Sequence, residues 1–157
     1  MVRRRIICIP EILFSQHIGN IKRGLRRSFE AIAAEHEITA TQFQVLRRLW
    51  SGDGINAQTL AREAQLDAAT MTGVLDRLES KGLLRREKDR IDRRAVSIVL
   101  TAAGRDLETP LLQARLKNNE IALVGLSKIE REQLLGLLER VERNLRSAEK
   151  GAGNGVG

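Results

Sequence analysis

The fold is decided by residues 57–100, which read AQTLAREAQLDAATMTGVLDRLESKGLLRREKDRIDRRAVSIVL. The first half of this stretch predicts two short helices joined by a tight turn. Asn56 and Asp67 stand immediately before these helices, where the side chain of an N-cap residue accepts a hydrogen bond from the helix backbone. The first helix is expected over 57–64, and the second ends at Lys81-Gly82, because glycine commonly closes a helix.

The second half of the stretch has a different hydrophobic period. Residues 83–87 and 94–100 suit β-strands, and apolar side chains alternate along the later one. Residues 88–93 form a short, highly charged connection between them, so a hairpin is expected. Helix, turn, helix and charged hairpin, in this order, make a winged helix-turn-helix. The second helix of that motif is narrow enough to enter the major groove of duplex DNA.

The second helix of the motif separates its residues by polarity. Its apolar side, which is expected to face the domain, consists of Met71, Val74, Leu75 and Leu78. The residues left for its other faces are Ala69, Thr70, Thr72, Gly73, Asp76 and Arg77. Small residues near the helix start let its backbone approach DNA, and hydroxyl groups there can bond phosphates or bases. Helical hairpins without such a role share this pattern, so the motif alone leaves both interpretations open.

Amphipathic helices precede the motif. Pro10 suits the first position of a helix that runs to about His36. Thr39 and Gln42 form a T-x-x-Q capping box, which predicts a second helix through Trp50. The apolar stripe of the first helix comprises Phe14, Ile18, Ile21, Leu25, Phe29 and Ile32.

Further amphipathic helices follow the motif. One is expected to start at Thr101, and Pro110 should kink or divide it. Ser127 and Glu130 form a second capping box, which opens a last helix. The apolar stripe of that helix comprises Leu134, Leu137, Leu138, Val141 and Leu145.

The stripes of the first and last helices are too long for one winged domain of about 70 residues to cover, and monomers avoid exposed apolar patches of that kind. We therefore expect dimerisation helices at 11–36 and 102–147 around a winged helix-turn-helix domain at 37–101. The termini, 1–10 and 148–157, are expected to be flexible. The predicted fold class is mainly α with a small β-hairpin wing.

Composition limits the classes of function. The chain has 157 residues, a net charge of +7 and no tyrosine, which fits a globular chain with an aliphatic core and an anionic partner. Charge alone does not distinguish DNA from RNA or a membrane surface, but no stretch approaches the ~20 apolar residues of a membrane span. Cys8 is the only cysteine, which excludes an internal disulfide and favours a reducing compartment. We expect a cytoplasmic protein without a membrane partner.

Two segments resemble those of a known family. Residues 92–104, DRRAVSIVLTAAG, closely resemble the D-x-R…L-T-x-x-G signature of the MarR (multiple antibiotic resistance regulator) family. Residues 78–86, LESKGLLRR, resemble its L-E-x-x-G-L-[IV]-x-R segment. Residues 130–145 fit the closing helix of the family and residues 18–49 its first two helices. The resemblance covers roughly residues 11–147, and the D-x-R…L-T-x-x-G run is its most specific part.

The resemblance implies DNA binding. Members of the family are homodimers whose terminal helices interlock and whose winged domains straddle a pseudo-palindromic operator in double-stranded DNA. It further implies that Arg94, held by the carboxylate of Asp92, reaches into the minor groove while the recognition helix enters the major groove. The recognition-helix positions carried over are Ala69, Thr70, Thr72 and Arg77. Further candidates, for nonspecific phosphate contacts, are Lys88, Arg90 and Arg93.

The resemblance also implies regulation by a signal. Most members repress transcription, and many release DNA when a phenolic compound or another small anion binds between the dimerisation and DNA-binding regions. The side chains that could line such a cleft here are Phe14, His17, Phe43 and Trp50. Core packing is the alternative role for the three aromatic residues.

Two alternative functions stay open. Cys8 precedes a helix N-terminus and follows three arginines, both of which favour a thiolate, so a peroxide-sensing repressor acting through Cys8 is the first. The peroxide sensors that the family contains carry their cysteine inside the first helix and use tyrosines that this chain lacks. A winged-helix module that binds protein instead of DNA is the second. The basic net charge and the intact Asp92-x-Arg94 argue against it.

No enzymatic chemistry is indicated. The sequence has no Ser-His-Asp arrangement, no phosphate-binding glycine loop and no metal-binding motif. His17 and His36 are the only histidines and, with one cysteine, make a poor set of zinc ligands. We therefore expect a regulator that is not an enzyme and needs no cofactor.

Overall fold

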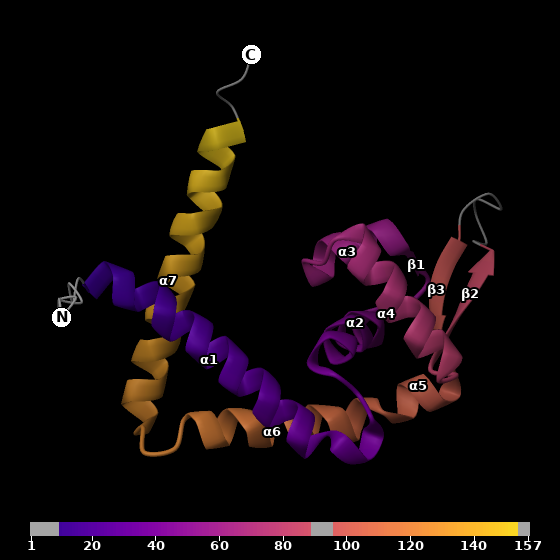
Figure 1. Cartoon of the computed structure of the whole chain (residues 1–157), viewed down its shortest axis with the longest axis horizontal. Coiled ribbons are helices and arrows are strands. Elements are labelled where there is room, and N and C mark those ends of the chain that lie inside the picture. The colour runs from indigo at the N-terminus through magenta and orange to yellow at the C-terminus, as the bar shows by residue number, and fades with distance from the viewer. Residues whose placement is uncertain (1–9, 89–95, 154–157) are drawn as a thin grey trace, which may run out of the picture. The chain divides into compact units, whose positions relative to one another are not determined.

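The computed structural model describes the backbone of residues 10–88 and 96–153. It divides into two compact units, one ending at Asn119 and the other beginning at Glu120. The helices (Figure 1) are α1 (Pro10–Ile32), η1 (Ala34–His36, a 3-10 helix), α2 (Ala40–Ser51), α3 (Ala57–Ala64), α4 (Ala68–Ser80), α5 (Ala102–Asp106), α6 (Glu108–Ala122) and α7 (Lys128–Gly153). The strands are β1 (Ile55–Asn56), β2 (Leu84–Lys88) and β3 (Val96–Leu100). The predicted fold class, mainly α with a small wing, is confirmed.

The predicted boundaries of the helix-turn-helix are confirmed. The side chain of Asn56 caps α3 by accepting a hydrogen bond from the backbone N–H of Thr59 at 2.8 Å. Asp67 caps α4 through the backbone N–H of Thr70, also at 2.8 Å. After α4, Gly82 takes a left-handed φ of 69°, which glycine adopts without a steric penalty. Local sequence alone therefore sets both ends of the motif.

Both predicted capping boxes are present. At the start of α2, the N–H of Gln42 donates to Thr39 Oγ1 at 3.2 Å, and the N–H of Thr39 donates to the Gln42 side chain at 3.0 Å. In the second unit, the N–H of Ser127 donates to Glu130 Oε2 at 2.7 Å, and the N–H of Glu130 donates to Ser127 Oγ at 3.3 Å. Each box satisfies two backbone donors that a helix start leaves unpaired.

The first helix is shorter than predicted. α1 ends at Ile32, and the residues up to His36 form the separate 3-10 turn η1. Glu37 then takes a left-handed φ of 52°, which redirects the chain into α2. The apolar stripe stops at the same residue, Ile32, so the prediction extended the helix beyond the last residue of its own stripe.

The last helices also end differently from the prediction. The helix after Thr101 is divided as expected, but the break falls at Leu107, and Pro110 lies in the first turn of α6, where no backbone donor is needed. α7 continues to Gly153, beyond the predicted end at 147. Adding a residue to an established helix fixes few dihedral angles for one hydrogen bond, and Ala148 and Glu149 are good helix formers.

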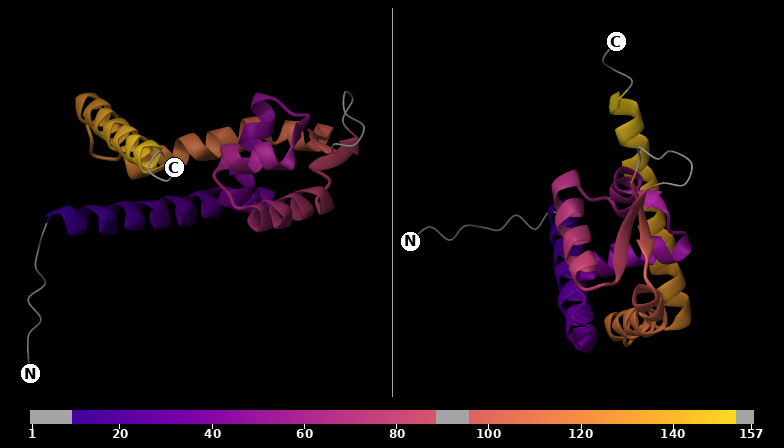
Figure 2. Two further views of the ribbon diagram at one scale, coloured as in Figure 1. Left: turned by 90° about the horizontal axis from the view of Figure 1, so that it is seen from above. Right: turned by 90° about the vertical axis from the view of Figure 1, so that its right-hand side faces the viewer.

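The wing belongs to a three-stranded antiparallel sheet in which β3 lies between β1 and β2. The predicted hairpin is confirmed, with Leu84 opposite Leu100 and Lys88 opposite Val96. β1, which pairs with β3, was not predicted, because two residues are too few to show a hydrophobic period. α4 packs beside β2 (Figures 1 and 2), so the sheet fixes the position of the second helix of the motif.

The core of the first unit is aliphatic, as the composition predicts. Two aromatic side chains, Phe29 and Phe43, belong to this core with their ring centroids 4.8 Å apart, and Trp50 packs against it with its ring centroid 6.0 Å from that of Phe43. The predicted apolar side of α4 is buried against this core. The large aliphatic side chains that are fully buried in the core of this unit include Leu46, Leu49, Leu60, Met71, Leu75, Leu78, Leu84, Ile98, Leu100 and Leu111.

Gly104, which follows the wing, lies at a position where a side chain does not fit. A Cβ placed on this residue would lie 1.9 Å from the carbonyl oxygen of Leu83, far inside any real contact. The same carbonyl accepts a hydrogen bond from the N–H of Thr101 at 3.1 Å, and the carbonyl of Gly104 accepts one from Trp50 Nε1 at 2.9 Å. α5 is therefore pressed against the base of the sheet at a point where only glycine fits.

Parts of the long helices stay uncovered. In the first unit, Asn118 of α6 is fully buried and donates to the carbonyl of Leu25 in α1 at 3.0 Å, so these two helices pack against each other. The exposed large apolar side chains on α1 and α6 in this unit are Phe14, Ile18, Ile21, Leu112 and Leu116. Those of the second unit are Ile121, Val124, Ile129, Leu135, Leu137 and Leu145. Among the residues described, no helix is both long and apolar enough to cross a membrane.

Candidate nucleic-acid interface

The outward face of α4 carries the four predicted recognition-helix residues. Ala69, Thr70, Thr72 and Arg77 are all exposed, whereas Met71, Val74, Leu75 and Leu78 are at most 5% exposed. The predicted separation of polarity is thus present in the structure. The 13-residue helix Ala68–Ser80 packs on the domain through its apolar side and leaves its polar side exposed.

Asp67 and Thr70 form a compact polar group at the start of α4. The Thr70 hydroxyl donates to Asp67 Oδ2 at 2.6 Å, in addition to the capping bond from the Thr70 backbone. These bonds hold the pKa of Asp67 below its ordinary value, with the Thr70 hydroxyl as the largest cause. Asp67 is therefore ionised at neutral pH, and a negative charge stands at the positive end of the helix dipole.

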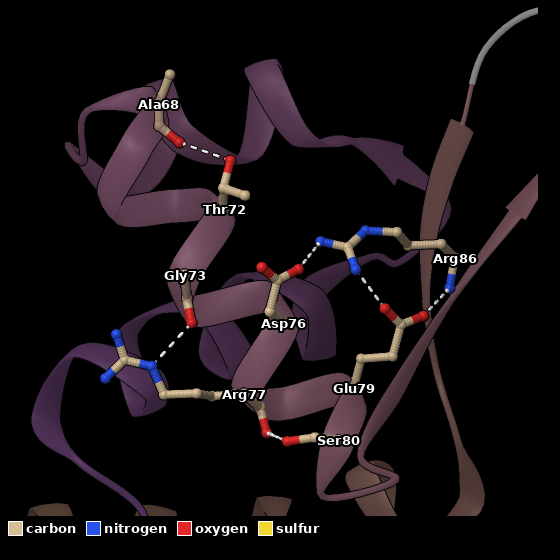
Figure 3. A network of polar contacts seen from close by, with 8 residues as sticks. All are labelled: Ala68, Thr72, Gly73, Asp76, Arg77, Glu79, Ser80 and Arg86. Atoms are coloured by element: carbon tan, nitrogen blue, oxygen red, sulfur yellow. Dashed lines mark hydrogen bonds and ion pairs between the residues drawn. The ribbon is translucent and has the colours of Figure 1, made fainter.

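Two further side chains of α4 bond to their own helix (Figure 3). The Thr72 hydroxyl donates to the carbonyl of Ala68 at 2.9 Å, and Arg77 Nε donates to the carbonyl of Gly73 at 2.9 Å. A Cβ at Gly73 would lie 3.3 Å from Arg77 Nη2, tighter than usual contact. Glycine at this position therefore leaves room for the Arg77 guanidinium to lie along the exposed face of the helix.

Arg86 of β2 clamps the same helix from the side of the wing. Its Nη2 lies 2.7 Å from Asp76 Oδ1, its Nη1 pairs with Glu79, and its backbone N–H donates to Glu79 Oε1 at 3.0 Å (Figure 3). Asp76 and, after it, Glu79 raise the pKa of the Arg86 guanidinium. The clamp joins the second helix to the sheet, and its one positive charge is shared by both carboxylates of this helix.

This clamp was not predicted from the sequence. Glu79 and Arg86 fall in the L-E-x-x-G-L-[IV]-x-R segment and Asp76 on a polar face of the helix, and no ion pair between them was expected. The available signal was the seven-residue spacing across Gly82. A glycine turn after the helix brings the strand back beside the last helical turns, which places an arginine near acids on the neighbouring face.

The wing tip is only partly described. Lys88 is exposed at the end of β2, opposite Val96. Arg90, Asp92, Arg93 and Arg94 lie outside the described residues, so their predicted contacts with DNA stay predictions. Cys8 also lies outside the described residues.

The four predicted ligand-binding side chains do not all lie together within one protomer. Phe43 is 5% exposed and packs between Phe29 and Trp50. Phe14 and His17 are exposed on α1, and Phe14 precedes Phe29 on that helix by about 22 Å of axial rise. A cleft lined by all four side chains would therefore need α1 from a second copy of the chain.

Known proteins are similar to this chain in sequence and in fold. The sequence model of the MarR family matches residues 38–96. The HTH-type transcriptional regulator TtmR of Methylorubrum extorquens is 35% identical over 76% of this chain, and the alignment spans 60% of TtmR. The HTH-type transcriptional regulator PecS of Dickeya dadantii is 31% identical over 82% of this chain and 81% of PecS.

The structural likeness is equally extensive. The structure of Bordetella bronchiseptica BpsR, whose DNA binding is regulated by 6-hydroxynicotinic acid, matches 82% of this chain and 91% of its own. The TM-score is 0.74 at 26% identity. Sequence and fold agree: the chain belongs to the MarR family of DNA-binding transcriptional regulators.

Proposed function

We propose that this protein is a homodimeric repressor that binds a pseudo-palindromic operator in duplex DNA and is released by a small-molecule effector. The observation that carries the proposal is the exposed face of α4, where Thr70, Thr72 and Arg77 stand on a buried apolar base. A helix presented in this way, next to a wing, fits the major groove. Its site of action would be the cytoplasm, where the operator is.

Dimerisation is supported by the exposed apolar side chains of the long helices. Phe14, Ile18 and Ile21 of α1 are 45%, 38% and 55% exposed, and monomers rarely expose contiguous apolar patches. Two identical domains on one face of B-DNA would read half-sites about 10–10.5 base pairs apart.

We expect the purified chain to be a dimer at micromolar concentration, because covering these apolar side chains removes them from water. Light scattering tests this directly. A mass near that of the 17.6 kDa chain would contradict the proposal, and a mass twice as large would support it.

Release by an effector is supported by BpsR, whose DNA binding responds to 6-hydroxynicotinic acid. Phe14, His17, Phe43 and Trp50 are our candidates for the cleft, with α1 supplied by the partner. Selecting bound fragments from the source genome, and repeating the selection with candidate effectors, tests the operator and the effector in one experiment.

The wing supplies a sharper test. We expect Arg94→Ala to weaken operator binding by about 1–3 kcal/mol and to flatten the dependence of log affinity on log salt by about one. Asp92→Ala should also weaken binding, although it removes a negative charge from a loop that faces DNA. The reason is that, in this proposal, Asp92 holds Arg94, and a free arginine must give up rotamers when it binds, at about 0.5–1.5 kcal/mol.

Fluorescence anisotropy at several salt concentrations measures both variants. If Asp92→Ala binds more tightly and Arg94→Ala binds like the unchanged protein, the wing does not read DNA in this protein.

A further inference from the structure

The direction of the Thr70 hydrogen bond is fixed by its partner. An ionised carboxylate can only accept, so the Thr70 hydroxyl must be the donor in its 2.6 Å contact with Asp67 Oδ2. Bonds of this kind, from a hydroxyl to a charged oxygen, are among the stronger hydrogen bonds in proteins. The single proton of Thr70 is therefore committed, and the exposed side of Oγ1 carries lone pairs only.

Thr72 is in the same state for a different reason. Its Oγ1 lies 2.9 Å from the carbonyl oxygen of Ala68, one turn earlier in the helix. A backbone carbonyl also only accepts, so the Thr72 hydroxyl donates inward. The hydroxyl oxygens of both threonines thus offer acceptors, not donors, to whatever the helix meets.

We propose that Thr70 and Thr72 read base amino groups, the N6 of adenine or the N4 of cytosine, in the operator. These amino groups are the only hydrogen-bond donors that base edges present in the major groove; N7 and O6 of guanine, N7 of adenine and O4 of thymine all accept. The proposal rests on the proposed placement of α4 in the major groove.

The same chemistry argues against a phosphate contact by Thr70. Phosphate oxygens are acceptors, so Thr70 would have to give up its bond to Asp67 before it could donate to one. The phosphate would also approach the carboxylate of Asp67, and like charges at that distance repel. Reading a base amino group keeps the Asp67 bond intact and brings a partially positive group near Asp67.

Asp67→Asn tests the proposal by reversing one hydrogen bond. Asparagine caps helices as well as aspartate does, so its Oδ1 keeps the backbone bond of Thr70. Its Nδ2 now donates to Thr70 Oγ1 and frees the hydroxyl proton to donate outward. The base facing Thr70 should then change from adenine or cytosine to guanine or thymine, by about fivefold, the scale of one net hydrogen bond.

The experiment sequences duplexes bound by the full-length protein from a randomised library. Thr70→Val identifies the position, because valine keeps the shape and removes the oxygen. Asp67→Asn in the Thr70→Val background is the matched control, since it changes the charge but has no hydroxyl to redirect. It should alter overall affinity and leave the base preference unchanged. Thr72→Val, with Thr72→Ser as its control, tests the second position.

Each outcome decides one question. A preference at one base pair that Thr70→Val removes, and that Asp67→Asn inverts between adenine or cytosine and guanine or thymine on the same strand, supports the inference. A preference that Asp67→Asn leaves unchanged overturns it and leaves operator binding standing. If no duplex is selected at all, the proposed function fails with it.

Discussion

Gly104→Ala should destabilise the first unit by about 3 kcal/mol or more, at the upper end of what overpacking does to a protein core. The added Cβ would lie 1.9 Å from the Leu83 carbonyl oxygen, and that contact is with backbone, which cannot rotate away. Moving α5 to relieve it would strain the bond from Trp50 Nε1 to the Gly104 carbonyl. Urea unfolding followed by the fluorescence of Trp50, the only tryptophan, measures the loss.

Gly52→Ala is the matched control. Gly52 has an extended φ of 163° and no heavy atom within 4 Å of a Cβ built on it, so alanine should leave the midpoint nearly unchanged. Equal effects of the two substitutions would show that α5 does not press on Leu83 as described.

Arg86→Ala should weaken DNA binding more than any other change on β2. Without Arg86, Asp76 and Glu79 keep their negative charges with no partner among the contacts described here, next to the helix that meets DNA. We expect a loss on the order of tenfold in operator affinity, the size of a lost charged contact. The unfolding free energy should fall by about 1–3 kcal/mol, because charged hydrogen bonds between helix and strand are lost.

Arg85→Ala is the control for this prediction. Arg85 is the neighbouring residue of β2 and, within residues 10–88 and 96–153, forms an ion pair with Glu87 alone, so its loss should change stability little. Replacing Asp76 and Glu79 by their amides in an Arg86→Gln background removes the unpaired charges, and DNA affinity should then partly recover. No recovery would mean that Arg86 acts on DNA itself and not through the two carboxylates.

The elements that the sequence predicts well are those specified by neighbouring residues. Thr39, Asn56 and Asp67 cap helices because a side chain three positions before a backbone N–H can reach it, which needs no tertiary contact. Gly82 ends α4 for an equally local reason. The expected alternation along β3 holds only in part, because Ile98 and Leu100 are buried whereas Val96 is 49% exposed.

What the sequence did not predict depends on contacts between distant segments. β1 exists because Ile55 pairs with Ile98, 43 positions later in the numbering. The clamp of Arg86 on Asp76 depends on how β2 returns beside α4. The role of Gly104 was hidden for the same reason, since only the folded chain brings it to the Leu83 carbonyl.

For the aromatic residues the sequence left two roles open, core packing and ligand binding, and could not decide between them. Phe43 packs in the core and Trp50 bonds to Gly104, both of which need no ligand. Phe14 and His17 are exposed on α1, as expected for residues that a second copy of the chain covers in a dimer. Periodicity places Phe14 on the apolar stripe of α1, and it does not tell which face another chain covers.

The affinity of Arg77→Ala for a selected operator, compared with that of Arg146→Ala, tests the central claim most directly. Arg77 is exposed on α4, whereas Arg146 is exposed on α7 and pairs with Glu142 at 3.3 Å. Both variants remove one positive charge. If the exposed face of α4 binds DNA, Arg77→Ala should lose about tenfold in affinity and Arg146→Ala should bind as the unchanged protein does. Equal losses, or no loss from Arg77→Ala, would contradict the account.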